Sequence, residues 1–298
     1  CCEIAGSQEN FKRRHFLSIH ANHIVTLSRI HGETIHVIEE ATNAGIPVHC
    51  NVFGQVGASS PVTLAGSVAQ TLAEILAGMA FINVLASDAP RIAGPRPMIT
   101  DLRTGGMAGG AGEQVMATSM AVQVLRHWQL PCSVIAGATD SKLVDFQSGY
   151  EKALTIQSSF QVGANLITQA AGSQAGLMGV CFGAMVADNE MLGAIHKANV
   201  IPRVDMETIA LDAINEVAKD EGHFLGRPET YERMRSDFLY PNLADRTTIE
   251  EWQESERLGI AQKAEVDAEE ILRKHWPNHG PTNVRRHYTE KYRLARKK

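Results

Sequence analysis

The segment VHCNVFGQVGASSPVTLAGSVAQTLAEILAGMAFINVL (48–85) contains a complete strand–loop–helix unit. Its first six residues, 48–53, form an apolar-rich run that is typical of a buried strand. Residues 54–60 are rich in Gly and Ser and predict a loop, after which Pro61 opens a helix. Large apolar residues recur every three or four positions through that helix, at Leu64, Val68, Leu72, Ile75, Met79 and Ile82. A buried strand followed by a long helix is the unit from which parallel α/β sheets are built.

The same unit recurs along the chain. Its strands are predicted at 16–25, 91–93, 131–137 and 164–169, and its helices at 32–43, 113–128, 145–160 and 205–219. This spacing predicts an α/β fold of the TIM-type (β/α) barrel class, with parallel strands inside and helices outside. Five or six strands are identifiable in the sequence, whereas a closed barrel has eight. Either strands have been overlooked or the first two or three precede the chain, and we favour a partial barrel that lacks its first strands.

The composition changes near residue 249. We assign 1–248 to the catalytic barrel portion and 249–298 to a C-terminal helical extension with a basic tail. The helix predicted at 249–276 is highly charged and is interpreted as a surface helix. One apolar stripe on it consists of Trp252, Leu258, Ala261, Ile271 and Leu272. The tail, 282–298, carries seven Lys or Arg residues and one acid; it is interpreted as a solvated end, with a docking segment for an acidic partner as the alternative.

Composition and charge exclude several classes of protein. The 298 residues are 44% hydrophobic and 20% charged with a formal net charge of −5, which argues against a chain-wide nucleic-acid surface. The five cysteines include no CxxC pair, so neither a disulfide framework nor a structural zinc site is predicted, and a reducing, cytoplasmic setting is expected. No signal peptide is visible, although the chain starts Cys1-Cys2 without Met. Polar residues interrupt the helix at 64–85, which favours a core helix over a membrane span.

Function in a parallel barrel lies in the loops that follow the strands. Those loops are predicted at 51–60, 94–112, 137–145 and 169–179, with a later return at 220–226. The side chains that they and the adjoining helix offer for substrate binding are Asn51, Gln55, Asp101, Arg103, Asp145, Gln147, Glu151 and His223. Asp140, Lys142 and Tyr150 are the candidates for a catalytic role.

Most of these candidates also have a structural interpretation. Asp101 and Arg103 are spaced to pair with each other across a loop. Asp145 is a natural N-cap for the helix that follows it. Gln147 and Glu151 lie four residues apart on one helical face and can belong to a plain surface.

The motifs of other enzyme classes are not found. The glycines at 105–112 resemble a phosphate loop in composition only, because neither GxxxxGK[ST] nor a GxGxxG directly after a strand is present. No HExxH points to a metal site, and no GxSxG marks a serine nucleophile. A barrel enzyme of another class, such as a lyase or hydrolase, therefore has no motif to support it.

Four long stretches of the chain have a counterpart in one known family. They are GASSPVTLAGSVAQTLAEILAG (57–78), ATDSKLVDFQSGYEKAL (138–154), VDMETIALDAINEV (204–217) and DEGHFLG (220–226). All four, in this order and spacing, resemble the trimethylamine:corrinoid methyltransferase family, and the similarity covers about 16–250. Because the chain has only standard residues, it is similar to the branch that lacks pyrrolysine.

The resemblance implies a TIM barrel that passes a methyl group from a methylated amine to the cobalt of a separate corrinoid protein. Some members of the non-pyrrolysine branch demethylate quaternary amines such as glycine betaine. The corrinoid (cobalamin) is expected to arrive on its partner protein, so no tightly bound cofactor and no metal site are expected in this chain. Two departures stand out: family members carry a longer N-terminal portion, and Phe146 stands where many relatives have a small residue.

A quaternary ammonium substrate suits such a site. Its amine leaves as a neutral molecule, so the enzyme mainly orients one N–CH₃ bond and excludes water. Aromatic faces and carboxylates attract a permanent cation; the candidates are Tyr150, Phe53 and Phe224 with Asp101, Asp140 or Glu151. If the substrate also has a carboxylate, a basic side chain could receive it; the candidates are Arg103, Lys142 and His223.

The alternative is a truncated, non-catalytic barrel fragment or a module that binds a corrinoid protein without turnover. A barrel that begins at residue 1 has open sheet edges, which are costly to leave unpaired and favour a homo-oligomer. The expected partners are a small methylated amine and a corrinoid protein, with neither nucleic acid nor a membrane.

Overall fold

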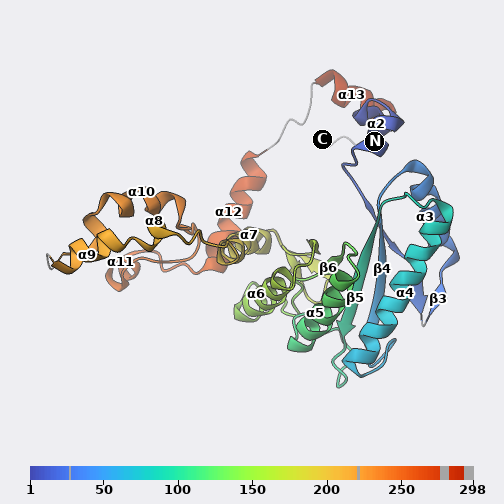
Figure 1. Cartoon of the computed structure of the whole chain (residues 1–298), viewed down its shortest axis with the longest axis horizontal. Coiled ribbons are helices and arrows are strands. Elements are labelled where there is room, and N and C mark those ends of the chain that lie inside the picture. The colour runs from blue at the N-terminus through green and yellow to red at the C-terminus, as the bar shows by residue number, and fades with distance from the viewer. Residues whose placement is uncertain (27, 220–221, 276–281, 292–298) are drawn as a thin grey trace.

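The computed structural model describes residues 1–26, 28–219, 222–275 and 282–291 (Figure 1). Its parallel strands alternate with helices along the chain, which confirms the α/β class. The parallel strands are β1 (Ile19–Asn22), β4 (Val48–Val56), β5 (Arg91–Ile99), β6 (Ser133–Ile135) and β7 (Leu166–Thr168). The helices that connect or follow them are α3 (Gly32–Ala44), α4 (Leu64–Leu85), α5 (Gly112–His127), α6 (Phe146–Gln161) and α7 (Phe182–Ala198).

The five parallel strands lie side by side in chain order. β1, β4 and β5 form one ladder, in which His20 lies opposite His49 and Asn51 lies opposite Gly94. β6 and β7 form a second ladder. A parallel bridge between Ala93 and Cys132 joins the two. In the part of the chain that the structure describes, β1 and β7 each pair on one side only, and no ladder closes the sheet into a barrel.

The side chains of β4 alternate between two faces of the sheet. Val48 and Cys50 are buried in the hydrophobic core, together with apolar residues of α4 and α5. His49, Asn51 and Phe53 point to the other face. We call this second surface the polar face of the sheet, and its members are His20, His49, Asn51, Phe53, Arg96, Ser133 and Thr168.

Strand β5 is longer than predicted, because the two prolines in its second half are atypical of a strand interior. It extends from Arg91 to Ile99, whereas the apolar pattern predicted only 91–93. The N–H of Ala93 points toward β6 and donates across the junction at 2.9 Å. Because backbone groups alternate in direction along a strand, the nitrogens of Pro95 and Pro97 face the same side of β5 as the Ala93 N–H. Both prolines lie past the Ala93–Cys132 bridge, where no described strand accepts a hydrogen bond from that side of β5.

Helix α4 packs against β4, β5 and α5. It is the one helix in the described part of the chain that is long and apolar enough to cross a membrane. Ile75 and Ile82 are fully buried in the core, which agrees with the predicted core helix. The helix begins at Leu64, after the N-cap Thr63, and so starts three residues later than Pro61 suggested.

Several short elements flank the parallel sheet. They are α1 (Cys2–Ala5), α2 (Gln8–Arg13), the antiparallel pair β2 (Ile24–Thr26) and β3 (Arg29–Ile30), and the hairpin of β8 (Ser173–Gln174) and β9 (Gly179–Val180). The hairpin occupies most of the loop predicted at 169–179.

The C-terminal part of the chain is helical. Its elements are α8 (Met206–Ile209), α9 (Leu211–Lys219), η1 (Phe224–Gly226), α10 (Pro228–Ser236), α11 (Ile249–Glu254), α12 (Ile260–Lys274) and α13 (Thr282–Lys291). Figure 1 shows α8 to α11 together, well away from the sheet, while α13 lies beside α2 at the other end of the molecule. An ion pair between Glu3 and Lys291 links that last helix to the N-terminal region.

Two predicted helices of this region differ from the observed ones. The helix predicted at 205–219 is broken by Ala210, whose φ of 55° is left-handed, although Asp205 caps the start of α8. The charged segment 249–276 forms α11 and α12 instead of one surface helix. α12 packs against α7 and buries Ala264 and Ala268, so the predicted stripe of larger residues is not the buried one. Residues 276–281 and 292–298 of this region lie outside the described residues.

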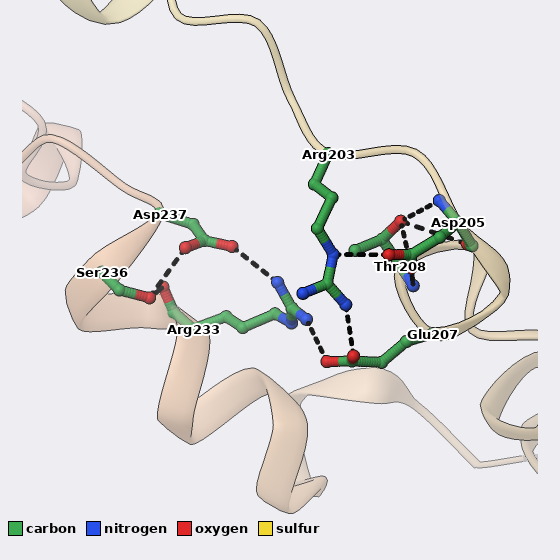
Figure 2. A network of polar contacts seen from close by, with 7 residues as sticks. All are labelled: Arg203, Asp205, Glu207, Thr208, Arg233, Ser236 and Asp237. Carbon is green, nitrogen blue, oxygen red and sulfur yellow. Dashed lines mark hydrogen bonds and ion pairs between the residues drawn. The ribbon is translucent and has the colours of Figure 1, made fainter.

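Charged side chains connect α8 to α10 (Figure 2). Arg203 pairs with Asp205 and Glu207, and Arg233 pairs with Glu207 and with Asp237 at 3.1 Å. All five side chains are substantially exposed, so water and salt weaken these attractions. The network therefore orients the two helices without forming a core between them.

Candidate functional site

Glu151 of α6 organises the loop that follows β6. One carboxylate oxygen accepts hydrogen bonds from the Thr139 hydroxyl at 2.5 Å and from the main-chain N–H of Asp140 at 2.8 Å. The other accepts from the side chains of Gln147 at 2.8 Å and Tyr150 at 3.4 Å. Glu151 itself is buried. Four candidates from the sequence, Asp140, Gln147, Tyr150 and Glu151, therefore lie together at the carboxyl end of β6.

The glycine-rich loop after β5 lies against this cluster. The N–H of Gly109 donates to Oδ1 of Asp140 at 3.3 Å. A Cβ at Gly110 would come within 2.4 Å of the Glu151 side chain, so glycine permits the close approach. Burial raises the pKa of the Asp140 carboxyl; the Gly109 N–H opposes this shift and the Glu151 charge reinforces it. The loop thus holds a carboxylate that is easier to protonate than an exposed one.

The start of α6 presents an aromatic pair beside the two carboxylates. Asp145 caps the helix by accepting a hydrogen bond from the N–H of Ser148 at 2.9 Å, which confirms its structural interpretation. The rings of Phe146 and Tyr150 lie 5.5 Å apart, and both are exposed. Desolvation and the neighbouring Glu151 carboxylate raise the pKa of the Tyr150 hydroxyl. Aromatic faces next to carboxylates are the surroundings that attract an organic cation.

Three basic or acidic candidates are engaged in local contacts. Asp101 and Arg103 form an exposed pair at 2.7 Å, which confirms the structural interpretation of their spacing. The Arg103 hydrogen bonds lower the pKa of the Asp101 carboxyl to about 2. The Lys142 ammonium donates to the main-chain oxygen of Asp140 at 2.7 Å.

The remaining candidates do not join the cluster around Glu151. Asn51 is buried within the sheet, where its Nδ2 lies 3.1 Å from Nδ1 of His20 and its Oδ1 has no hydrogen-bond partner. Gln55 is the penultimate residue of β4 and has an exposed side chain, while its carbonyl accepts the N–H groups of the following turn. His223 belongs to the segment between α9 and α10, which lies far from the sheet in Figure 1. The structure therefore does not bring His223 to the other candidates.

The polar face of the sheet contains side chains that the search of the loops missed. The rings of His20 and His49 are stacked with centroids 4.2 Å apart. The two nitrogens of His49 each lie 2.9 Å from a hydroxyl, those of Ser18 and Ser133. The sequence did contain an indication of this polar face. Polar residues occur at alternate positions of strands that were predicted to be apolar, as in HANH (20–23) and VHCN (48–51).

Arg96 spans this polar face. Its guanidinium donates to Nδ1 of His20 and to the Thr168 hydroxyl, each at 3.1 Å, and so links β5 to β1 and β7. Burial lowers the pKa of Arg96 to about 10. Burial, the neighbouring His20 and the Arg96 charge lower the pKa of His49 to about 4, and burial and Arg96 also lower that of His20. Both imidazoles are therefore neutral near pH 7.

Within the described residues, no three His, Cys, Asp or Glu side chains gather closely enough to hold a metal ion. The cysteines form no disulfide, and burial raises the pKa of the Cys50 thiol to about 12, which keeps it protonated and unreactive. An apolar hollow of about 520 Å³ lies between α6 and α7, away from the carboxylate cluster.

Comparison with known proteins identifies a family model and several relatives that cover most of the chain. The family model described as trimethylamine methyltransferase (MTTB) matches residues 1–297. A trimethylamine methyltransferase MttB of Desulfitobacterium hafniense (strain DSM 10664 / DCB-2) is 30% identical over 94% of this chain and 56% of its own length. A glycine betaine methyltransferase of Desulfitobacterium hafniense (strain Y51) is 29% identical over 74% of this chain and 46% of its own length.

An archaeal relative shows a similar degree of likeness. Trimethylamine methyltransferase MttB2 of Methanosarcina mazei is 29% identical over 80% of this chain and 48% of its own length. The chain spans about half the length of the curated relatives it matches. Its standard residues agree with the branch that lacks pyrrolysine. Because the family model covers nearly every residue, the chain belongs to the trimethylamine methyltransferase (MTTB) family.

Proposed function

We propose that this chain is the catalytic part of a methyltransferase that moves a methyl group from a quaternary methylated amine to a separate corrinoid protein. In the reaction, the N–CH₃ bond breaks, its electron pair stays on nitrogen, and the amine leaves neutral. Reduced cob(I)alamin on the partner supplies the electron pair of the new cobalt–carbon bond. The family match over residues 1–297 carries the proposal.

The arrangement at the start of α6 supports this chemistry. Tyr150 and Phe146 offer aromatic surface to a methylated ammonium, and the buried carboxylate of Glu151 lies directly behind Tyr150. Asp140 adds a second carboxylate, held by the Gly109 N–H. We assign Asp140, Lys142 and Tyr150 to the reacting end of the substrate. No proton has to be delivered when a quaternary amine leaves, so these groups orient the methyl carbon and exclude water.

We further propose that the parallel sheet is part of a TIM-type barrel. Five parallel strands in chain order, with helices packed on one face and polar side chains on the other, support this class. In such a barrel the polar face is the interior, and the corrinoid protein docks over the carboxyl ends of the strands. We keep 1–248 as the barrel portion and 249–298 as its helical extension, which is attached through the packing of α12 on α7.

The same proposal includes the compartment of the protein, its partners and its self-association. Buried, protonated thiols at Cys50 and Cys132 support the cytoplasm as the compartment. We expect partners limited to a small methylated amine and a corrinoid protein. The unpaired sides of β1 and β7 in the described sheet support self-association.

Methylation of cob(I)alamin by the full 298-residue chain tests the proposal directly. A panel of glycine betaine, choline, trimethylamine and tetramethylammonium is offered, and methylcobalamin is followed by its absorbance. We expect one quaternary amine to support methyl transfer. Alanine at Asp140, Lys142 and Tyr150 should lower the rate, whereas Glu250→Ala on α11 should not, since α11 lies far from the sheet (Figure 1).

Two results would count against the proposal. Unchanged rates in all three alanine variants would remove the α6 cluster from the reaction. Binding of a corrinoid protein without methyl transfer from any amine would favour the non-catalytic binding module.

A further inference from the structure

The hairpin of β8 and β9 has a strained turn. Three consecutive residues of the turn, Ala175, Gly176 and Leu177, have a left-handed backbone, with φ of 53°, 62° and 69°. Two of the three carry a Cβ, and the left-handed region is disfavoured for such residues by roughly 5- to 30-fold. Backbone strain persists only where surrounding contacts maintain it, and it concentrates at functional sites. The contacts of the turn therefore indicate what the strain serves.

The left-handed backbone directs two consecutive N–H groups toward one loop. Successive N–H groups of an extended strand point in opposite directions, whereas those of a helical backbone point the same way. The N–H of Ala175 donates to the Ser141 carbonyl, and the N–H of Gly176 donates to the Thr139 carbonyl, each at 2.8 Å. The turn thus binds the chain on both sides of Asp140.

These two hydrogen bonds complete the fixing of the Asp140 main chain. Its N–H donates to Glu151 at 2.8 Å, and its carbonyl accepts the Lys142 ammonium at 2.7 Å. A Cβ added at Gly176 would lie 3.5 Å from Oδ1 of Asp140, so the turn also lies against the carboxylate. Because the main chain is fixed, only the side-chain torsions of Asp140 remain free, and the Gly109 N–H restrains them at 3.3 Å.

The base of the hairpin is anchored to α6, the helix that carries the carboxylate cluster. Gln174 of β8 is buried and donates to the Ser148 hydroxyl of α6 at 3.2 Å. The N–H of Gly172 donates at 2.8 Å to Asp188, which forms a buried ion pair with Lys152 of α6. The hairpin is therefore held at its base and bonded to the Asp140 loop at its turn, so it can fix that loop relative to α6.

We propose that the β8–β9 hairpin is a strained element that positions the Asp140 carboxylate, with Ala175 and Gly176 as the positioning residues. The inference rests on the proposed function, because the methyl transfer assigned to Asp140 requires that placement. Both residues act through main-chain N–H groups and have no polar side chain, so no motif of reactive residues identifies them. A misplacement of about 1 Å in such a site costs on the order of 100-fold in rate.

Ala175→Val and Ala175→Gly test this role with opposite changes at one position. A β-branched residue is a severe outlier at positive φ, so valine should turn its N–H away from Ser141. Glycine adopts this backbone freely and should keep the hydrogen bond. Hydrogen exchange is followed on the full chain without any amine. We expect the Asp140 and Gly176 amides to exchange at least about fivefold faster in Ala175→Val, and no faster than in the unmodified chain in Ala175→Gly.

Gln129→Val is the matched control. Gln129 is exposed and also left-handed, with φ of 58°, but it precedes β6, whereas the carboxylate cluster follows that strand. The substitution should leave exchange at the Asp140 and Gly176 amides unchanged. If Ala175→Val does not fold, Gly176→Ala takes its place, because its Cβ would make only ordinary contacts. Its cost is the left-handed backbone alone, and we expect exchange at the same amides to be about fivefold faster.

Methyl transfer separates positioning from general support of the fold. Ala175→Val should lower the rate about 10- to 100-fold, whereas Ala175→Gly and Gln129→Val should retain it. The double variant Ala175→Val with Asp140→Ala should be no slower than Asp140→Ala alone, because the hairpin acts through that carboxylate. A further loss of rate in the double variant overturns the assignment. Unchanged exchange at both amides in the folded hairpin variant does the same.

The two readouts distinguish this inference from the proposed function. Faster exchange in Ala175→Val, together with no methyl transfer from any amine by the unmodified chain, supports the positioning of Asp140 and contradicts the methyltransferase proposal. An unreduced rate of methyl transfer in folded Ala175→Val contradicts the role of the hairpin and leaves the methyltransferase proposal in place.

Discussion

Lys152 of α6 and Asp188 of α7 form a buried ion pair, with Nζ and Oδ2 2.6 Å apart. The same carboxylate oxygen accepts the N–H of Gly172 at 2.8 Å. The pair thus connects two helices to the loop that follows β7. A buried pair of this kind adds little stability compared with an apolar pair, but removal of one partner leaves a charge without compensation.

Lys152→Met should destabilise the protein by about 3–5 kcal/mol, because Asp188 remains buried and unpaired. The free energy of unfolding in urea measures the loss. Asp101→Asn is the control: it breaks an exposed pair and should have little effect. The double variant Lys152→Met with Asp188→Asn should recover much of the loss, because it removes the unpaired charge and keeps an oxygen that can accept the Gly172 N–H; a double variant no more stable than the single one would contradict this account.

Stability should fall as the pH drops from about 6.5 to about 4, through His49. Its pKa is about 4 in the folded protein, against an ordinary value of 6.5. Between these values the unfolded chain binds a proton that the folded protein does not, so acid favours unfolding; above 6.5 the contribution is fully present. The shift corresponds to at most about 3 kcal/mol.

Urea unfolding at several pH values checks this prediction. His49→Asn should flatten the pH dependence across that window. His36→Asn, which changes a largely exposed histidine, should leave the slope as it was. An unchanged slope in His49→Asn would assign the acid sensitivity to other groups.

Gly94→Ala should disrupt the polar face of the sheet. A Cβ at Gly94 would lie 2.1 Å from Oδ1 and 3.0 Å from Cα of Asn51, and that Cα belongs to a neighbouring strand that cannot move freely. Overpacking of this kind costs about 1–3 kcal/mol. Gly112→Ala, at the start of α5 with no atom within 4 Å of the new Cβ, should be neutral or slightly stabilising. Equal melting temperatures for the two variants would show that the strands adjust.

Glu151→Gln should loosen the loop that carries Asp140. A glutamine NH₂ group turned toward the Asp140 N–H would place two donors together, and in the opposite orientation it requires the Gln147 amide to flip and replaces a charged acceptor with a neutral one. We expect a loss of about 1–3 kcal/mol and faster hydrogen exchange at the Asp140 amide. Glu256→Gln, on an exposed stretch, serves as the control. A protected Asp140 amide in Glu151→Gln would indicate that the loop is held by other contacts.

Local sequence was sufficient wherever the signal itself is local. Apolar periodicity located α3 and α4, and the position of Asp145 before a helical pattern predicted its capping hydrogen bond. The rule that functional residues follow parallel strands also pointed to Asp140, Tyr150 and Glu151, which lie together because all three belong to the loop and helix that follow β6. The same rule failed for His223, whose segment does not return to the sheet.

The sequence by itself determined the α/β class, the family and the residues around Glu151, because periodicity, capping and long motifs act over neighbouring positions. Only the tertiary structure decided that α12 packs on α7 and that Arg96 meets His20 and Thr168 without a carboxylate. Arg96 lies more than seventy positions along the chain from both His20 and Thr168. Whether a charge is compensated depends on which strands are brought side by side, and no local pattern around Arg96 contains that information.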